Sequence, residues 1–325
     1  MAGGLATSRY FNREVFQFEE IACATFSPGN PLQVLKGMKK ISSGIIQSRK
    51  ILQDFNPDVI VGFGSFFTLP VLAAAALLRK PIVLHEQNAI PGKVNRTFAR
   101  WAHTATITFP STRSYLKGKA AKNAVEVIFP QRKRGPSTDQ EAWDYFGLQK
   151  CERPLLLVFG GSQGAVRLNA LFLESISLLP PVQVLHFTGN EERACEARKR
   201  YQDLAIAACV KPFEPRMDLA MRIADCAVTR AGAATVCELI DNALPALLVP
   251  YPFAAENHQE ENGAHFVSIV KGGKMYKENE IDTALLAHSI VELLANQKTA
   301  RNHIKAYTAQ RQTVHLADLI QDIAQ

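Results

Sequence analysis

Two turns built from small residues lie where the chain could bind a phosphate. The segment GGSQGA (residues 160–165) follows the apolar run 154–159, and RAGAA (residues 230–234) follows the short apolar run 225–229. Small residues let a ligand approach the backbone closely, and the helix expected after each turn offers unpaired N–H groups at its positive dipole end. We therefore expect phosphate or pyrophosphate contacts at both turns, although such a turn is also an ordinary strand–helix connection.

Side chains suited to a ribose and a sugar follow the second turn. Glu238 lies about one helical turn further on, where its carboxylate can accept hydrogen bonds from both ribose hydroxyls. The segment 250–262 is predicted to be a long polar loop after the buried strand 245–249. It contains His258, Gln259 and Asn262, and uncharged hydrogen-bonding groups of this kind suit the hydroxyls of a sugar.

Three further places carry polar groups at the expected ligand edge of a sheet. HEQN (residues 85–88) comes directly after the predicted strand 81–84, and open α/β sheets bind ligands beyond the carboxyl ends of their strands. The Pro-rich turn 211–217 follows another strand, and its backbone groups can read a flat base edge. Arg132 lies in a basic Pro/Gly-containing break, where it either reaches a phosphate or is a solvated linker charge.

The same segments argue against other chemistry. GGSQGA differs from the GxGxxG dinucleotide fingerprint, and the next strand, 182–187, ends in Thr188-Gly189-Asn190 without a carboxylate. The GK[ST] ending of an ATP-binding P-loop is also missing. None of the six cysteines forms a CxxC pair or has a histidine at metal-ligand spacing, so we expect no metal and no other cofactor.

The elements that must position these groups predict an α/β protein with two doubly wound, Rossmann-like domains. A chain of 325 residues exceeds what one core usually supports. The apolar runs predict strands at 58–63, 81–84, 104–108, 125–129, 154–159, 182–187, 205–210, 225–229, 245–249 and 266–270. Helices are predicted at 31–55, 70–78, 166–179, 218–224, 235–239, 281–295 and 303–323, and one opens within 89–95, whereas 14–24 is either one strand or two short pieces.

Composition and charge limit the partners. The sequence contains no window of 18 apolar residues and no apolar signal-peptide core, so we expect a cytoplasmic protein. Its net charge of +7 suits nucleic acid, an acidic membrane surface or phosphorylated substrates, but motifs of nucleic-acid-binding proteins are missing. The helix 31–55 has Leu32, Leu35, Met38, Ile41, Ile45 and Leu52 at helical spacing, with Lys36, Lys39, Lys40, Arg49 and Lys50 as either a solvated face or a contact for anionic lipid.

Four of these segments resemble one enzyme family. HEQNAIPGKVNR, GGSQGA, TRAGAATVCELIDNALPALLVPYP and AAENHQEENGA look like the MurG family of UDP-N-acetylglucosamine transferases, over a stretch from about residue 57 to the end. The resemblance implies the GT-B architecture, with two domains facing a cleft. It also implies inverting transfer of N-acetylglucosamine to the muramyl 4-hydroxyl of undecaprenyl-linked lipid I, at the cytoplasmic face of the cell membrane. That reaction makes lipid II for peptidoglycan and so serves cell-wall synthesis, cell shape and division.

The resemblance also assigns residues and domain limits. It implies that Ser162 and Arg132 contact the donor phosphates, that the backbone at Phe213–Glu214 reads uracil, and that Glu238 holds the ribose. The N-acetylglucosamine hydroxyls would be contacted by Ala233, Asn88, His258, Gln259 and Asn262. We expect an acceptor and membrane-side domain at 1–134, a donor domain at 135–305, and a C-terminal segment, 306–325, that packs back on the first domain.

One departure from the family pattern concerns the N-terminus. The family opens with a strand and a GGTGGH-like loop, whose histidine is a candidate general base, and residues 1–30 contain no such motif. We therefore expect a first domain that is incomplete at its N-terminus, and we assign no catalytic base. The alternatives are a non-catalytic UDP-sugar-binding remnant and another GT-B enzyme, such as a UDP-N-acetylglucosamine 2-epimerase.

Overall fold

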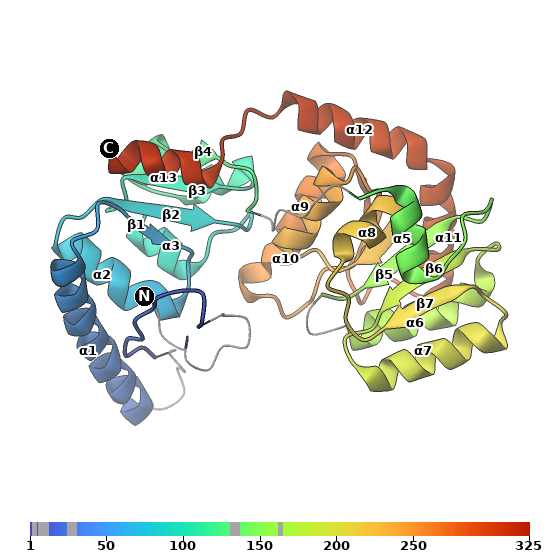
Figure 1. The fold of residues 1–325 in the computed structure, drawn as a ribbon, viewed down its shortest axis with the longest axis horizontal. Coiled ribbons are helices and arrows are strands. Elements are labelled where there is room, and N and C mark those ends of the chain that lie inside the picture. Colours follow the sequence, from blue (N-terminus) through green and yellow to red (C-terminus); the bar gives the residue numbers. More distant parts are fainter. Residues whose placement is uncertain (2–4, 6–12, 25–30, 131–136, 162–164) are drawn as a thin grey trace. The chain divides into compact units, whose positions relative to one another are not determined.

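The computed structural model describes residues 1, 5, 13–24, 31–130, 137–161 and 165–325. The chain forms two compact units, and Figure 1 colours the first from blue to green with its last helix, α13, in red. Unit 1 contains residues 1–130 together with 312–325, and unit 2 contains residues 131–311. Each unit is an α/β structure built on a parallel sheet of its own.

In the described residues of unit 1 the sheet has four parallel strands, which follow one another in chain order, β1-β2-β3-β4. The strands are β1 (Ile60–Gly62), β2 (Ile82–Glu86), β3 (Thr104–Ile107) and β4 (Val125–Glu126). The helices of this unit are α1 (Pro31–Phe55), α2 (Leu69–Leu77), α3 (Lys93–Phe98), α4 (Lys119–Lys122) and α13 (Leu316–Ala324), with short 3₁₀ turns at Phe66–Thr68 and Pro110–Tyr115.

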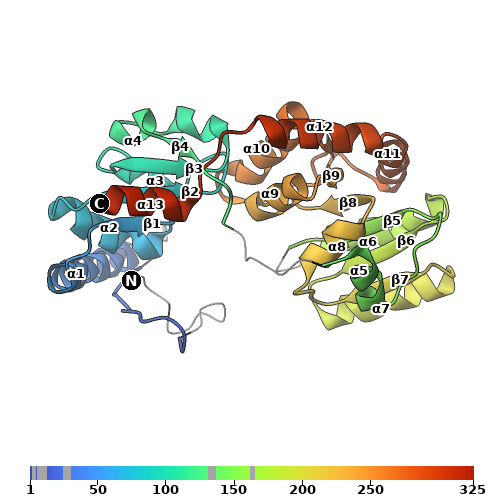
Figure 2. The same ribbon diagram turned by 45° about the horizontal axis from the view of Figure 1, so that its top comes forward.

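Helix α1 has the predicted bounds, and part of its predicted apolar stripe, including Ile41 and Leu52, is buried. Leu35 and Met38 were expected to face the core, yet they are 65% and 54% exposed. The buried stripe instead includes Gly44, where an added Cβ would lie 1.9 Å from the carbonyl oxygen of Ala22. The absence of a side chain therefore lets the segment around Ala22 pack directly on the helix, while α2 lies along the same helix (Figures 1 and 2).

The sheet of unit 2 has six parallel strands in the order β10-β9-β8-β5-β6-β7. The strands are β5 (Leu155–Phe159), β6 (Gln183–Phe187), β7 (Ala208–Lys211), β8 (Cys226–Thr229), β9 (Ala246–Leu248) and β10 (Gly273–Met275). The helices are α5 (Asp139–Phe146), α6 (Val166–Ser175, extended by a 3₁₀ turn at Ile176–Leu178), α7 (Glu191–Asp203), α8 (Met217–Ile223), α9 (Ala233–Asp241), α10 (His258–Ala264), α11 (Thr283–Ala295) and α12 (Gln297–Gln310).

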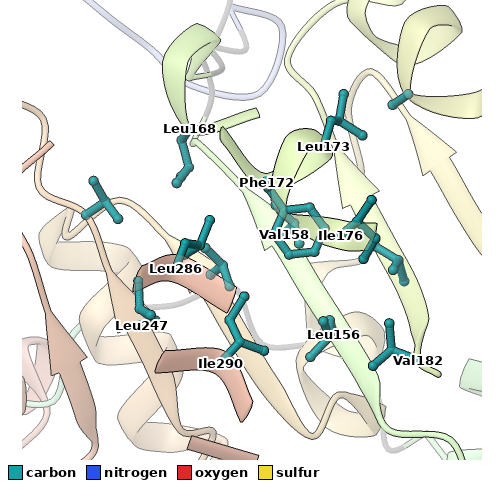
Figure 3. Close-up of a cluster of buried hydrophobic side chains, with 14 of the residues drawn as sticks. Leu156, Val158, Leu168, Phe172, Leu173, Ile176, Val182, Leu247, Leu286 and Ile290 are labelled. Atoms are coloured by element: carbon teal, nitrogen blue, oxygen red, sulfur yellow. The ribbon is translucent and has the colours of Figure 1, made fainter. Parts of the chain in front are cut away.

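Helices α6 and α11 cover the centre of this sheet. Figure 3 shows Leu156 and Val158 of β5 among side chains from α6, including Phe172. Leu286 of α11 packs in the same cluster. Strand β5 is buried along its whole length, as expected for a strand with parallel neighbours on both sides and an almost wholly apolar sequence. A rigid central strand of this kind fixes the position of the loop that follows it.

Four predicted elements were wrong. The polar segment 250–262 is not all loop, because it contains a 3₁₀ turn (Ala255–Asn257) and the start of α10. The predicted strand 266–270 is a π-helical continuation of α10 (His265–Ile269), whose Phe266 is fully buried. The predicted helix 303–323 is two helices, α12 and α13, and residues 14–24 form no strand.

The last residues of the chain return to unit 1. Val314 pairs with Val127 beyond β4, since its N–H donates to the carbonyl oxygen of Glu126 at 3.3 Å and its own carbonyl accepts from Ile128 at 3.1 Å. Figure 2 shows α13 beside the sheet of that unit. Helix α1 is the longest helix, but neither it nor any other helix in the described ranges qualifies as a membrane span.

Candidate functional site

The strand order of unit 2 places a crevice at the ends of β5 and β8. After β5 the chain builds β6 and β7 on one side, and after β8 it builds β9 and β10 on the other. The loops that leave these two neighbouring strands therefore diverge, and this switch point is where open α/β sheets bind ligands. A cavity of about 600 Å³ lies there, a size within the range of small-molecule sites.

Both predicted glycine turns contribute to the cavity wall. Gly160 and Gly161 follow β5, and Gly161 has a φ of +84° with open space where a Cβ would project. Ser162 and the next two residues lie outside the described residues, as does Arg132. Gly232 begins α9 without a side-chain cap, so the first N–H groups of this nine-residue helix are not satisfied by a capping side chain.

Helix α10, not a loop, carries three of the predicted sugar-contacting residues, His258, Gln259 and Asn262. Gln259 lines the cavity, and its Oε1 accepts a 2.9 Å hydrogen bond from the backbone N–H of Tyr251. Asn262 is buried, with its Nδ2 donating to the carbonyl oxygen of Ala231 at 3.2 Å. His258 donates from Nδ1 to the carbonyl oxygen of Ala255 at 2.6 Å. In the neutral ring, Nε2 is then a hydrogen-bond acceptor. Asn262 thus holds the second glycine turn in place through a hydrogen bond to its backbone.

Helix α9 carries two other predicted residues at different depths. Ala233 is its first residue and is buried. Glu238 lies in its second turn and is half-buried. The residues that form the cavity wall in the described part of unit 2 include Gly232 and Thr235 of this segment, but neither Ala233 nor Glu238. Thr235 was not predicted, although its hydroxyl in the first turn of a helix after a glycine was a readable signal.

Sequence reasoning also missed Arg230. Its side chain is only 9% exposed, and its guanidinium donates to the carbonyl oxygens of Val249 (3.0 Å) and Pro250 (3.2 Å) and pairs with Glu278. Both Arg230 and Glu278 line the cavity. An arginine in a small-residue turn was a visible signal, but its carbonyl and carboxylate partners lie 19 to 48 residues further along the chain.

The predicted base-reading turn follows β7. Phe213 is 65% exposed, whereas Glu214 is buried. The Glu214 carboxylate accepts hydrogen bonds from the Lys211 ammonium (2.7 Å), the Tyr145 hydroxyl (2.9 Å) and the backbone N–H of Arg216 (2.6 Å). The Glu214 carboxylate therefore holds the turn in shape, while the side chain of Phe213 is exposed.

Asn88 belongs to unit 1, where a buried carboxylate holds it. Glu86, at the end of β2, accepts from the backbone N–H groups of Asn88 and Gly92 and from Nδ2 of Asn95, each at 2.9 Å. His85 donates from Nδ1 to the Thr106 hydroxyl at 3.0 Å, and burial lowers the pKa of this histidine to about 4. His85 and Glu86 thus lie inside the strand, not beyond it, and serve as scaffold.

The described ranges contain no group of three or more His, Cys, Asp or Glu side chains arranged to hold a metal ion. The residues that line the cavity in unit 2 offer backbone N–H groups, the guanidinium groups of Arg167 and Arg230, an amide and the hydroxyls of Thr235 and Tyr251, and the Arg230 guanidinium is paired with a carboxylate. This set can bind a ligand with phosphates and hydroxyls by hydrogen bonds and helix-dipole interactions.

Comparison with known proteins agrees with this geometry. Residues 155–322 match the glycosyltransferase family 28 C-terminal domain, and residues 4–107 match the glycosyltransferase family 28 N-terminal domain. The structure is similar to a crystal structure of Acinetobacter baumannii MurG, with a TM-score of 0.75 and 22% identity over 96% of this chain and 85% of that one. Two parallel-sheet α/β units with these domains define a family 28 glycosyltransferase of GT-B fold.

Two bacterial transferases are similar over most of the chain. Both are named UDP-N-acetylglucosamine–N-acetylmuramyl-(pentapeptide) pyrophosphoryl-undecaprenol N-acetylglucosamine transferase. The protein from Protochlamydia amoebophila is 40% identical over 100% of this chain and 87% of its own length, and the one from Chlamydia pneumoniae is 33% identical over 87% and 78%. The chain therefore belongs to the MurG family of N-acetylglucosamine transferases.

Proposed function

We propose that this chain transfers N-acetylglucosamine from UDP-N-acetylglucosamine to the muramyl 4-hydroxyl of undecaprenyl-linked lipid I, with inversion at the anomeric carbon. The observation that carries the proposal is the cavity at the switch point of unit 2, walled by both glycine turns, in a chain 40% identical to a transferase of that name. The product is lipid II, a precursor of peptidoglycan.

The donor is proposed to lie across the carboxyl ends of the unit 2 strands. The backbone at Phe213 and Glu214 reads uracil beyond β7, and Glu238 accepts hydrogen bonds from the ribose. The pyrophosphate lies at the glycine turns, with Ser162 and Arg132 as further contacts, where helix N-termini stabilise the charge that develops on the leaving UDP. Ala233, His258, Gln259 and Asn262 surround the sugar.

The outer face of α1 supports a peripheral location at the cytoplasmic face of the membrane. Leu35, Met38 and Ile46 are exposed, at 65%, 54% and 71%. The exposed basic residues of the same helix are Lys36, Lys39, Lys40, Arg49 and Lys50. Exposed apolar side chains among basic ones suit an anionic lipid surface, where each basic residue contributes about 1 kcal/mol. Replacing Lys36, Lys39 and Lys40 with Gln should reduce pelleting with anionic vesicles, and unchanged pelleting would refute this role.

The transferase is tested by UDP release from UDP-N-acetylglucosamine with and without a lipid I analogue. Release that depends on the acceptor is the expected result. Release without an acceptor would favour hydrolysis or the epimerase alternative, for which the 40% identical relative gives no support. No release, together with donor binding in a titration, would indicate a UDP-sugar-binding protein that does not catalyse transfer.

A further inference from the structure

An ion pair spans the carboxyl ends of three neighbouring strands at the cavity wall. Arg230 follows β8 directly, and its Nη1 donates to the carbonyl oxygens of Val249 and Pro250 beyond β9. Its Nη2 donates to the carboxylate of Glu278, three residues beyond β10. A guanidinium can make these contacts together because its N–H donors form a rigid planar fork, which a lysine cannot reproduce.

The Arg230–Glu278 ion pair, called the clamp below, fixes the position of the backbone segment that hydrogen-bonds to Gln259. The two carbonyls it binds precede Tyr251, whose ring centroid lies 5.7 Å from the Arg230 guanidinium carbon. The backbone N–H of Tyr251 donates to Gln259 Oε1 at 2.9 Å. Because that bond uses the amide oxygen, the group that Gln259 offers the cavity is its NH₂, with two donors. A shift of Tyr251 would therefore turn or release the amide.

We propose that Arg230 and Glu278 are positioning residues for the sugar end of the donor pocket, acting through the segment 249–251 on the orientation of Gln259. The inference rests on the proposed function, because it takes the cavity to hold UDP-N-acetylglucosamine. The strand order makes it specific: the clamp joins β8, β9 and β10, whereas the proposed uracil-reading turn follows β7 at the opposite edge of the sheet. Loss of the pair should therefore weaken binding of the sugar part of the donor and leave binding of the nucleotide part unchanged.

The test is calorimetric binding of UDP and of UDP-N-acetylglucosamine to the full chain and its variants. Glu278→Ala should weaken UDP-N-acetylglucosamine binding about tenfold while UDP binding changes less than about twofold, as expected when a partner of a contacting residue is lost. Arg230→Lys should have a similar effect, and Glu278→Gln, which retains an acceptor, should restore part of the affinity. The matched control is Glu280→Ala, because Glu280 is an exposed carboxylate two residues away.

Two results would overturn the inference. Equal losses for UDP and UDP-N-acetylglucosamine would mean that the pair supports the whole unit, and unchanged UDP-N-acetylglucosamine binding would mean that it positions nothing. Should Glu278→Ala or Arg230→Lys fail to fold by circular dichroism, the nearly isosteric Glu278→Gln decides, with a loss of about threefold or more expected for the sugar nucleotide alone. A wild-type chain that binds neither ligand refutes the proposed function and the inference together, whereas unaffected variants of a binding wild type refute only the inference.

Discussion

The polar groups at the carboxyl ends of the two sheets differ in their environment. In unit 1 the described strands follow one another in chain order, and Glu86 at the end of β2 is saturated by N–H groups from its own loop and from α3. In unit 2 the strand order reverses between β5 and β8, and the loops there leave a cavity walled by glycines and an uncapped helix start. Polar residues at a strand end thus do not by themselves make a ligand site, because their hydrogen-bonding groups can already be satisfied by neighbouring residues of the protein.

The largest expected effect comes from removing the saturated carboxylate. Glu86→Ala should lower the free energy of unfolding of unit 1 by about 3 kcal/mol, because three N–H groups in a mostly buried site lose their acceptor. Urea denaturation gives this value, and calorimetry with UDP-N-acetylglucosamine gives the donor affinity of unit 2, which should not change. Weakened donor binding would break the contrast between a scaffold in unit 1 and a site in unit 2.

Glu238 gives the next largest effect, on binding and not on stability. Glu238→Ala should weaken UDP-N-acetylglucosamine binding by about 2 kcal/mol, the size of a hydrogen-bonded contact to a charged group. Glu174→Ala is the control, since Glu174 is an exposed carboxylate on α6 of the same unit. An unchanged dissociation constant for Glu238→Ala would remove the ribose assignment.

A pair of glycines that both have positive φ separates backbone strain from ligand contact. Gly161 and Gly147 both have positive φ, at +84° and +65°, and both have open space where a Cβ would project. Alanine at either position should cost about 1 kcal/mol of stability. Gly161→Ala alone should also weaken donor binding, by about 1 kcal/mol or more, because the methyl group enters the cavity. Equal donor affinities for the two variants would place the pyrophosphate elsewhere.

The smallest effect concerns a buried histidine in each unit. Burial lowers the pKa of His85 in β2 to about 4 and that of His186 in β6 to about 3, from an ordinary value of 6.5. His186 donates from Nε2 to Asn169 Oδ1 and accepts at Nδ1 from the Tyr201 hydroxyl, so its neutral form is satisfied on both sides. Protonation of either ring is therefore costly in the folded chain.

These depressed pKa values contribute stability that is present above pH 6.5 and is lost as the pH falls from 6.5 towards 4, where the unfolded chain binds the protons first. At pH 5.5 each histidine should account for a loss of about 1 kcal/mol relative to pH 7. Urea titrations should show a flatter pH dependence for His186→Gln than for the wild type, whereas His288→Gln, at an exposed position, should follow the wild type. A wild-type curve that is flat over this range would contradict the prediction.

The sequence predicts those parts of the fold in which local pattern and burial agree. Strand β5 and helix α1 appear where apolar runs and helical spacing place them. The π-helical segment His265–Ile269 was predicted to be a strand, because its short apolar run looks the same in both states and α10 before it reads as polar. Gly44 was invisible as a core position, since a buried glycine leaves no apolar residue in the pattern.

For the site, the glycine turns and Gln259 could be read from local motifs, and they do line the cavity. The Arg230–Glu278 pair could not be predicted from local motifs, because the two residues are 48 positions apart and meet only when β8, β9 and β10 align. The same holds for the side chain of Glu214, whose partners Lys211 and Tyr145 are brought together only by the fold.

The pairing of Val314 with Val127 bears on the order in which the chain folds during synthesis. Domains usually complete their folding as they leave the ribosome, N-terminal ones first. Here residues 1–130 of unit 1 precede unit 2, but residues 312–325 of unit 1 are made only after unit 2, which has all its residues by position 311. Unit 1 is therefore started before unit 2 and completed after it. Until residues 312–325 are made, the edge of the unit 1 sheet beyond β4 lacks the pairing of Val127 with Val314 while unit 2 folds.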